Sequence, residues 1–278
     1  MKDGVSVRKQ GQSERIIMRQ ITLFLMVLFV GVGSAEAVLK TKSVEYHHGD
    51  VLLEGYLAYD DSFSGPRPGV LVVHEWRGLN DYTKHRAEQL AGLGYIAFAA
   101  DMYGRGIYAK DHEEAGKLSG IYRNDRHLMR ARAQAALDCI QSQPGVDGNK
   151  LAAIGYCFGG STVLELARSG ADLKGVVSFH GPLDTPNPND AKNIRGKVLV
   201  LTGAADSFIP PKQIAAFEQE MKSAGVDYRV IQYPGAVHSF TVPDAGNDPS
   251  KGVAYNPEAD KKSWDEMKQF LQKIFKAA

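Results

Sequence analysis

The chain has 278 residues, of which 44% are hydrophobic and 23% are charged, with 29 Gly and 12 Pro. This balance is typical of a globular protein and excludes a long disordered chain, a collagen-like repeat and a coiled coil. The formal net charge of +1 gives no basic excess that would predict a nucleic-acid partner, and two cysteines are too few for a disulfide scaffold or a four-cysteine zinc site.

The first 37 residues have the order of a secretory signal peptide. Basic residues precede a short apolar run over Ile21–Val32, and Ala35-Glu36-Ala37 has the small-x-small pattern of a cleavage site. The run is shorter than the roughly 20 residues that span a bilayer, so we expect no stable membrane insertion after cleavage. An uncleaved anchor or a buried helix is the alternative, and Met18 is a possible true start. We therefore expect a signal peptide at 1–37, one domain over 38–278 and an exported protein, periplasmic in a Gram-negative bacterium.

Strand and helix patterns alternate at short spacing through the rest of the chain. We expect strands over Val44–Tyr46, Val51–Tyr59, Gly69–His74, Tyr95–Ala100, Leu151–Gly155, Gly175–Phe179, Lys197–Thr202 and Tyr228–Gln232. We expect helices over Asp81–Leu93, Tyr122–Gln141, Phe158–Arg168, Pro211–Ala224 and Lys261–Lys276. The polar stretches Asp101–Gly120 and Pro243–Pro257 are predicted loops. This alternation predicts an α/β fold, with a mostly parallel central sheet flanked by helices on both faces.

The most specific motif is Gly155-Tyr156-Cys157-Phe158-Gly159-Gly160, which lies between a predicted strand and a predicted helix. It matches the strand–turn–helix elbow G-x-S-x-G, with Cys157 in the position of the nucleophile. The glycines leave room for a crowded turn, and the N-terminus of the following helix favours the thiolate form of the cysteine. We therefore predict that Cys157 is a catalytic nucleophile; a buried structural cysteine is the alternative.

A nucleophile of this kind needs a base and a residue that orients the base. In the chain order nucleophile, acid, histidine, Asp206 follows one predicted strand and His238 follows the next. Both lie in loops at carboxyl ends of strands, where such sheets build their sites, and we predict a triad of Cys157, Asp206 and His238. His180 and His74 also end predicted strands and could line the same cleft. A zinc site from His74, His180 and His238 is conceivable, but no metal-binding spacing supports it.

Attack on a carbonyl creates an anion that backbone N–H groups must stabilise. One N–H comes from the residue after the nucleophile, Phe158, and the other from the loop after the third strand, at Trp76. Glu75 in that loop could accept the thiol proton or hold the cysteine inactive until substrate arrives. A salt bridge from Glu75 to Arg77 or Arg105 is the alternative.

From about Lys42 to its C-terminus the chain resembles the dienelactone hydrolase family of α/β-hydrolases. The most specific matching stretches are Gly155–Gly160, His74–Asn80, Asp101–Arg105 and His238–Phe240. The resemblance implies a single-domain, carboxymethylenebutenolidase-like hydrolase of lactones and small carboxylic esters, with a Cys157–His238–Asp206 triad and no metal or organic cofactor. It also implies that Glu75 contacts the thiol in the resting enzyme, and that Arg105 and Ser239 help bind a substrate carboxylate.

Two departures from the family pattern concern the substrate. Thr241-Val242-Pro243 replaces a second arginine expected just past the histidine, and a signal peptide is atypical for enzymes of aromatic catabolism. A substrate carboxylate that has lost one of two arginine partners is poorly held. The resemblance therefore supports the fold and the chemistry more strongly than it supports dienelactone as the substrate. We predict an ester or lactone hydrolase acting through a thioester acyl-enzyme. The alternatives are a thioesterase or other acyl hydrolase on the same triad, and an exported binding protein without turnover. Cys139, on a predicted helix, could form a disulfide with Cys157 and silence it.

Overall fold

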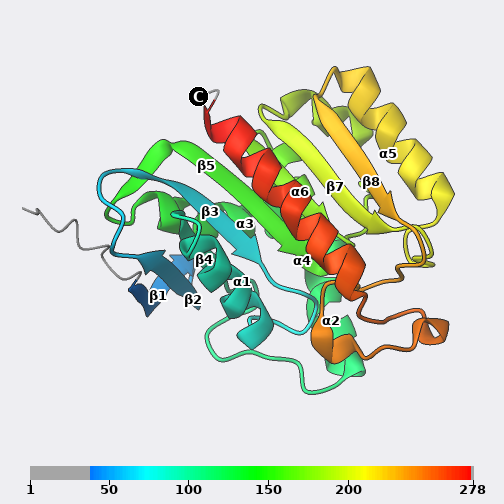
Figure 1. Ribbon diagram of the computed structural model, residues 1–278, viewed down its shortest axis with the longest axis horizontal. Coiled ribbons are helices and arrows are strands. Elements are labelled where there is room, and N and C mark those ends of the chain that lie inside the picture. The colour runs from blue at the N-terminus through cyan, green and yellow to red at the C-terminus, as the bar shows by residue number, and fades with distance from the viewer. Residues whose placement is uncertain (1–37, 277–278) are drawn as a thin grey trace, which may run out of the picture. The chain divides into compact units, whose positions relative to one another are not determined.

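The computed structural model describes residues 38–276, so the predicted signal segment lies outside the described residues. Eight strands form one sheet in the order β1-β2-β4-β3-β5-β6-β7-β8 (Figure 1). The strands are β1 Leu39–His48, β2 Val51–Asp60, β3 Arg67–Val73, β4 Ile96–Ala100, β5 Val146–Tyr156, β6 Gly175–Phe179, β7 Lys197–Gly203 and β8 Tyr228–Tyr233. The first two strands are antiparallel to their neighbours, and all pairs from β4 to β8 are parallel. The carboxyl ends of the parallel strands therefore meet at one edge, where a site can form.

Helices cover both faces of this sheet. They are α1 Asp81–Ala91, α2 His112–Asn124, α3 Arg126–Gln141, α4 Phe158–Arg168, α5 Pro211–Ala224 and α6 Pro257–Lys276, with short 3₁₀ helices at Pro188–Asn193, Pro243–Ala245 and Pro249–Lys251. The predicted α/β fold class is confirmed. Within residues 38–276, no helix has the length and apolar character needed to cross a membrane.

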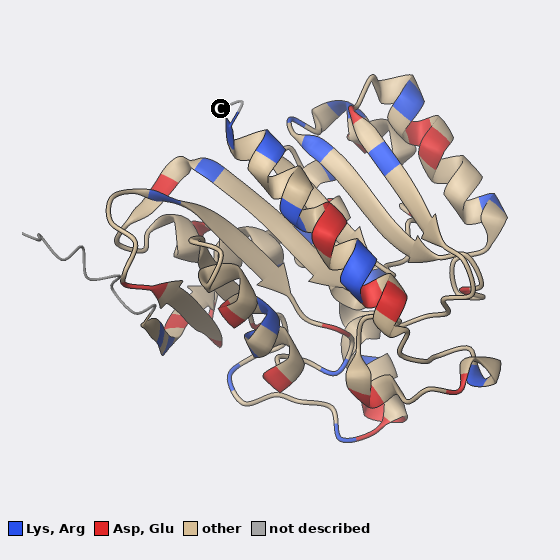
Figure 2. Ribbon diagram, in the orientation of Figure 1, with Lys and Arg blue, Asp and Glu red and all other residues tan. Residues whose placement is uncertain are grey.

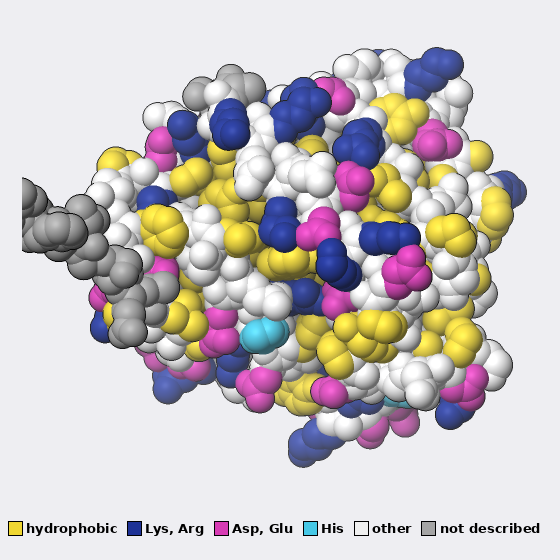
Figure 3. Space-filling view, viewed as in Figure 1, with side chains coloured by type: hydrophobic (Ala, Val, Ile, Leu, Met, Phe, Trp, Pro, Cys, Tyr) yellow, Lys and Arg dark blue, Asp and Glu magenta, His cyan; other side chains and the backbone are white. Residues whose placement is uncertain are grey.

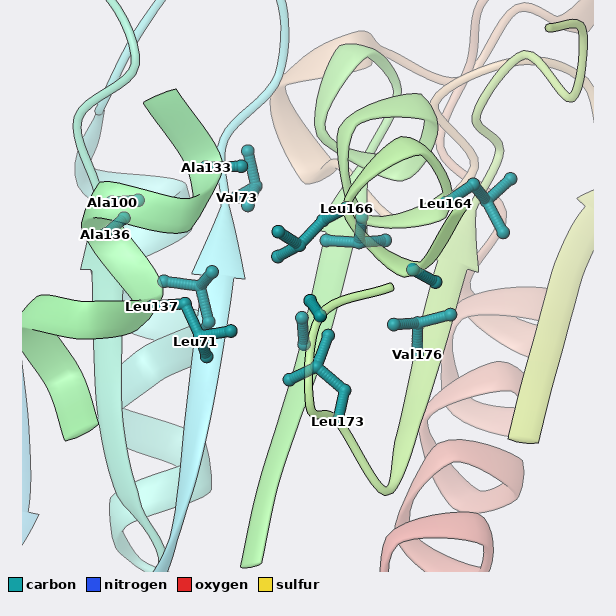
Figure 4. Close-up of a cluster of buried hydrophobic side chains, with 14 of the residues drawn as sticks. Leu71, Val73, Ala100, Ala133, Ala136, Leu137, Leu164, Leu166, Leu173 and Val176 are labelled. Atoms are coloured by element: carbon teal, nitrogen blue, oxygen red, sulfur yellow. The ribbon is translucent and has the colours of Figure 1, made fainter. Parts of the chain in front are cut away.

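The central strands are apolar on both faces because helices bury both. On β3, Val70 and Val72 pack in the cluster that includes α1 and α6. The alternate residues Leu71 and Val73 pack in the opposite cluster, with α3 and α4 (Figure 4). Successive side chains of a strand point to opposite faces, so a run of large apolar residues stabilises both layers at once.

The helix α6 has one buried face and one charged face. Met267 and Leu271 are fully buried against the sheet. Figure 2 shows acidic and basic residues alternating along α6, and Figure 3 shows both signs intermixed on this face of the molecule. The pairs Lys261–Asp265 and Lys262–Glu258 lie four residues apart. Such exposed pairs stabilise a helix by only about 0.2–0.5 kcal/mol each, so burial is what fixes α6 on the sheet.

Most elements lie close to their predicted bounds, and β6, α4 and α5 begin and end as predicted. The main correction concerns Asp101–Gly120, which is not all loop because α2 begins at His112. The single helix predicted from Tyr122 is in fact the end of α2 followed by α3. Asp111 caps α2 and Asp125 caps α3, each by accepting a hydrogen bond from the backbone N–H three residues later. Asp125 thus ends one helix and starts the next.

Gly159, in the first turn of α4, has no room for a side chain. A Cβ there would overlap the carbonyl oxygen of Val73 at the end of β3. We expect Gly159→Ala to lower the free energy of unfolding by about 2–3 kcal/mol, because overpacking forces the backbone to shift. The matched control is Gly116→Ala in α2, where a Cβ meets nothing within 4 Å. It should raise stability by about 0.5–1 kcal/mol in urea unfolding. Equal stability of Gly159→Ala and the unmodified chain would contradict this account of the elbow.

Candidate active site

Cys157 lies at a sharp turn between β5 and α4. Its backbone has φ +52° and ψ −113°, a conformation that side chains rarely adopt. A Cβ on Gly155 would overlap the backbone of Gly159, so these two glycines allow the strand and the helix to approach closely. The Cys157 N–H donates to the carbonyl of Phe179 on β6 at 3.0 Å, which fixes the turn to the sheet. The elbow therefore presents the thiol at the carboxyl edge of the parallel strands.

The structure brings together the three residues of the predicted triad. The Nε2 atom of His238 lies 3.1 Å from Cys157 Sγ, and its Nδ1 lies 2.9 Å from Asp206 Oδ2. Asp206 follows β7 and His238 follows β8, so neighbouring parallel strands deliver the acid and the base. The second oxygen of Asp206 accepts a hydrogen bond from the Phe208 N–H at 2.9 Å, which holds the carboxylate toward the ring. All three side chains belong to buried residues.

The charge of His238 depends on its two partners. Burial acts to lower the pKa of its imidazole, but Cys157 and Asp206 outweigh burial and raise the pKa to about 10. Because this value lies above neutrality, the imidazolium persists at pH 7 and is lost as the pH rises through about 10. A protonated ring beside the sulfur stabilises a thiolate, and it also holds a proton that it can later donate.

The two predicted oxyanion donors both border Cys157. Phe158 is the first residue of α4, so its N–H has no partner within the helix. Trp76, in the loop after β3, lines the same cavity as Cys157, and its carbonyl accepts a hydrogen bond from Tyr103 at 2.8 Å. Within residues 38–276, neither N–H has a hydrogen-bond acceptor in the protein. Both donors are thus available to an oxygen atom of a substrate.

Glu75 bonds to Ser239 rather than to the thiol. The Ser239 hydroxyl donates to Glu75 Oε1 at 3.1 Å, while the hydrogen bond of the Cys157 thiol is with His238. Burial raises the pKa of the Glu75 carboxyl, and His238 and the Ser239 hydroxyl oppose that rise. The described residues give Glu75 no ion pair with Arg77 or Arg105. Ser239 itself lines the cavity.

Arg105 was expected to bind substrate, and the structure corrects its position. Its guanidinium forms ion pairs with Glu45 at 2.7 Å and Glu54 at 3.6 Å, and the side chain is 55% exposed. Its backbone N–H donates to the carbonyl of Leu52. The β1–β2 hairpin thus draws this arginine outward, and it does not line the cavity at Cys157.

His180 and His74 were also expected to line the cleft, and both lie behind it instead. His180 is fully buried, with Nε2 2.8 Å from Thr241 Oγ1 and its ring edge-on to that of His238. His74 is fully buried too, and its Nε2 accepts a hydrogen bond from the Met102 N–H. Burial lowers the pKa of both rings, so both are neutral. Within residues 38–276, no group of three or more His, Cys, Asp or Glu side chains is placed to hold a metal ion.

A cavity of about 590 Å³ opens at Cys157. Its walls come from the carboxyl-end loops of β3, β5, β6, β7 and β8 and from the junction of α2 with α3. Phe208 is 58% exposed and packs edge-on against His238. Arg123 and Arg126 also line the cavity, and neither was predicted as a site residue from the sequence. The sequence feature that could have indicated them is the pair itself, since one arginine lies on each side of Asp125, the N-cap of α3.

The two cysteines are both free. Cys139 lies on α3 and packs at the border of the apolar cluster between α3 and the sheet. Burial raises the pKa of its thiol to about 11, so it is a poor nucleophile at neutral pH. The disulfide that we considered between Cys139 and Cys157 is not formed in this structure.

Comparisons with known proteins agree with this fold. Residues 53–275 match the family model described as the dienelactone hydrolase family. A relative from Yersinia pestis that carries the name carboxymethylenebutenolidase is 31% identical over 226 residues, which cover 77% of this chain and 81% of that protein. The solved structure named m3DLH is 42% identical, with a TM-score of 0.82, and covers 85% of this chain and 98% of its own. A dienelactone hydrolase-like promiscuous phosphotriesterase from metagenomic libraries is 43% identical, with a TM-score of 0.81 and the same coverage.

Proposed function

This chain belongs to the dienelactone hydrolase family, and from that premise we propose that it hydrolyses carboxylic esters or lactones through a Cys157–His238–Asp206 triad. It is a hydrolase of the dienelactone hydrolase type that acts on a small molecule. The observation that supports the triad is a pair of hydrogen bonds made by the ring of His238. One joins its Nε2 to Cys157 Sγ and the other joins its Nδ1 to Asp206 Oδ2, at an elbow that opens into the cavity. A cavity of about 590 Å³ is of the size that holds a small-molecule substrate.

The first half of the reaction forms a thioester. The Cys157 thiolate attacks the carbonyl carbon, and the carbonyl oxygen becomes an oxyanion that accepts hydrogen bonds from Trp76 and Phe158. As the tetrahedral intermediate collapses, the C–O bond breaks and the His238 imidazolium donates its proton to the leaving oxygen. The acyl group is then held on sulfur.

The second half follows from the altered charge at sulfur. The Cys157 thiolate is the largest influence that raises the pKa of His238, and the thioester no longer carries that charge. The imidazole therefore becomes a base. It takes a proton from water, the resulting hydroxide attacks the thioester, and the acid leaves as the thiolate re-forms. Asp206 holds the ring in one orientation through both halves.

The first test is hydrolysis of a panel of small esters, a thioester and dienelactone by the chain from Val38 onward. We expect measurable turnover of small esters, and the best substrate defines the class. If no member is hydrolysed while iodoacetamide still alkylates Cys157, the hydrolytic proposal fails and a binding role is favoured.

A second candidate function is hydrolysis of phosphotriesters. It is favoured by the 43% identity to a protein described as a promiscuous phosphotriesterase. The thiolate would attack phosphorus, the P–O bond to the leaving group would break, and water would release the phosphoryl group from sulfur. Turnover of paraoxon that disappears in Cys157→Ala supports this activity, and turnover that persists in that variant excludes it.

We further propose that residues 1–37 are a signal peptide, on the pattern of basic residues, apolar run and cleavage site. When the full chain is produced in a Gram-negative host, the periplasmic product should have the mass of a chain that begins at Val38. A double change of Ala35 and Ala37 to Gln should block this processing, since signal peptidase requires small residues there. An unprocessed chain confined to the cytoplasm, or a product that begins at Met18, would contradict the proposal.

A further inference from the structure

A second cavity of about 640 Å³ adjoins the one at Cys157. It lies between the α2–α3 junction and the segment that follows β6. Four residues line both cavities: Arg123, Asn124, Arg126 and Asp184. The two cavities therefore adjoin, and Arg123 borders both spaces.

Most charged side chains of the second cavity already have partners. Arg126 pairs with Asp184 at 3.1 Å, and Arg130 pairs with Asp190 at 2.7 Å. Asp125 accepts a hydrogen bond as the N-cap of α3. Asp184 and Asp190 are thus paired with other arginines, and within residues 38–276 Asp125 forms no ion pair with Arg123.

Arg123 is the cation that lacks a partner. Across residues 38–276, its guanidinium has no ion pair and no hydrogen bond, and its Nε atom is buried. Thr185 Oγ1, in the wall of the same cavity, is also buried without a partner. Arg123 lies in the last turn of α2, where its positive charge interacts favourably with the helix dipole. That interaction uses none of the N–H donors of the guanidinium. Buried polar groups in native proteins are usually satisfied, so these two atoms are positions at which a ligand could form hydrogen bonds.

We propose that the second cavity is a subsite for an anionic group of the substrate, which Arg123 binds while the ester bond lies at Cys157. The proposal rests on the proposed function and adds the substrate class, an extended ester with an anionic group away from the scissile bond. A guanidinium suits this role because its fork of N–H donors matches a carboxylate in two parallel hydrogen bonds. Arg126 pairs with Asp184 and Arg130 with Asp190, which reduces the repulsion of an anion by these two carboxylates.

Matched pairs of substrates test the subsite. On the acyl side, the nitrophenyl monoester of adipic acid is compared with nitrophenyl heptanoate. On the leaving-group side, acetoxybenzoate is compared with phenyl acetate. We expect Arg123→Gln to lower kcat/KM for the anionic member of at least one pair by roughly 10- to 100-fold, mainly through KM, and to change the neutral members by less than about 3-fold. Arg123→Lys should restore part of the loss, because it keeps the charge without the fork.

The control is Arg105→Gln, which removes an arginine that is bound to Glu45 and Glu54 outside both cavities. It should leave both members of each pair unchanged. The proposal is overturned if Arg123→Gln affects anionic and neutral esters alike, or neither, or if Arg105→Gln shows the selective loss. Each of these results would leave the proposed hydrolase function standing.

Protection of Cys157 from alkylation does not require turnover, so it tests the subsite separately from the proposed hydrolase function. Adipate should slow the alkylation of Cys157 by iodoacetamide several-fold in the unmodified chain, and the neutral adipamide should not. In Arg123→Gln the protection by adipate should disappear. If the unmodified chain hydrolyses no ester, the proposed function fails, and this measurement still decides the subsite: equal protection in both proteins, or none in either, overturns it.

Discussion

Cys157→Ala is expected to lower kcat for the best small ester by at least about 10⁴-fold. The reason is that the thiol of Cys157 is the group that His238 contacts, and loss of a triad nucleophile removes most of the catalytic power of such sites. The variant should fold normally, since alanine fills most of the same space at the elbow. Steady-state hydrolysis and the mass of the acylated protein measure the two consequences, the loss of turnover and the loss of the thioester.

The matched control for this variant is Cys139→Ala. Both changes remove one thiol, but Cys139 lies on α3 away from the cavity, with a thiol pKa raised to about 11 by burial. Hydrolysis by Cys139→Ala should stay within about 2-fold of the unmodified chain, and iodoacetamide should still inactivate it. Equal activity of Cys157→Ala and Cys139→Ala would show that the thiol at the elbow is not the nucleophile.

Local sequence was sufficient to predict the fold and to identify Cys157, Asp206 and His238 as residues that the fold brings together. The strands of the parallel sheet are short, continuous apolar runs such as β6. Such runs are typical of strands that are buried on both faces, so the sequence alone indicates them. The elbow needs glycines within a few residues of Cys157, so it leaves a mark in the sequence itself. Asp206 and His238 lie in the loops that follow β7 and β8, and parallel strands deliver such loops to the same edge.

The direction of side chains beyond the strand ends could not be predicted in this way. Arg105 follows β4 as the resemblance implied, but carboxylates of a distant hairpin bind it outside the cavity. His180 follows β6 directly, but it lies behind the triad, where it forms a hydrogen bond with Thr241. Arg123 was predicted near the start of one helix from Tyr122, but it lies in the last turn of α2, and the position of α2 brings it to the cavity. Each of these outcomes depends on a partner far away in the chain.

The strained backbone conformations of the described residues lie at the proposed active site. Within residues 38–276, the non-glycine residues with positive φ are Cys157, His180 and Ser239. The first is the proposed nucleophile, the second packs on the proposed base, and the third bonds Glu75. Such conformations cost about 1–3 kcal/mol each, so the surrounding fold must hold them in place. This clustering supports the site independently of any motif.

Asp206→Asn is expected to lower kcat by about 10³- to 10⁴-fold and to change the pH dependence. Asparagine keeps the shape of the carboxyl but removes its charge, so it no longer favours the imidazolium or one orientation of the ring. Asp206 is one of the groups that raise the pKa of His238, and its removal must lower that pKa. The ring then loses its proton at a lower pH, so the general acid that protonates the leaving group disappears earlier as the pH rises.

The measurement is kcat/KM against pH for an alkyl ester, whose leaving alkoxide needs the proton of His238. In the unmodified chain the rate should fall as the pH rises through about 10, and in Asp206→Asn this fall should move to lower pH. Asp227→Asn is the matched control, because Asp227 is an exposed carboxylate paired with Lys197 far from the cavity. It should change neither the rate nor the profile, and circular dichroism should show that all three proteins stay folded over the range. An alkaline limb that stays in place in Asp206→Asn, with a rate within about 10-fold, would mean that His238 owes its charge to the thiolate alone and that Asp206 does not orient the base.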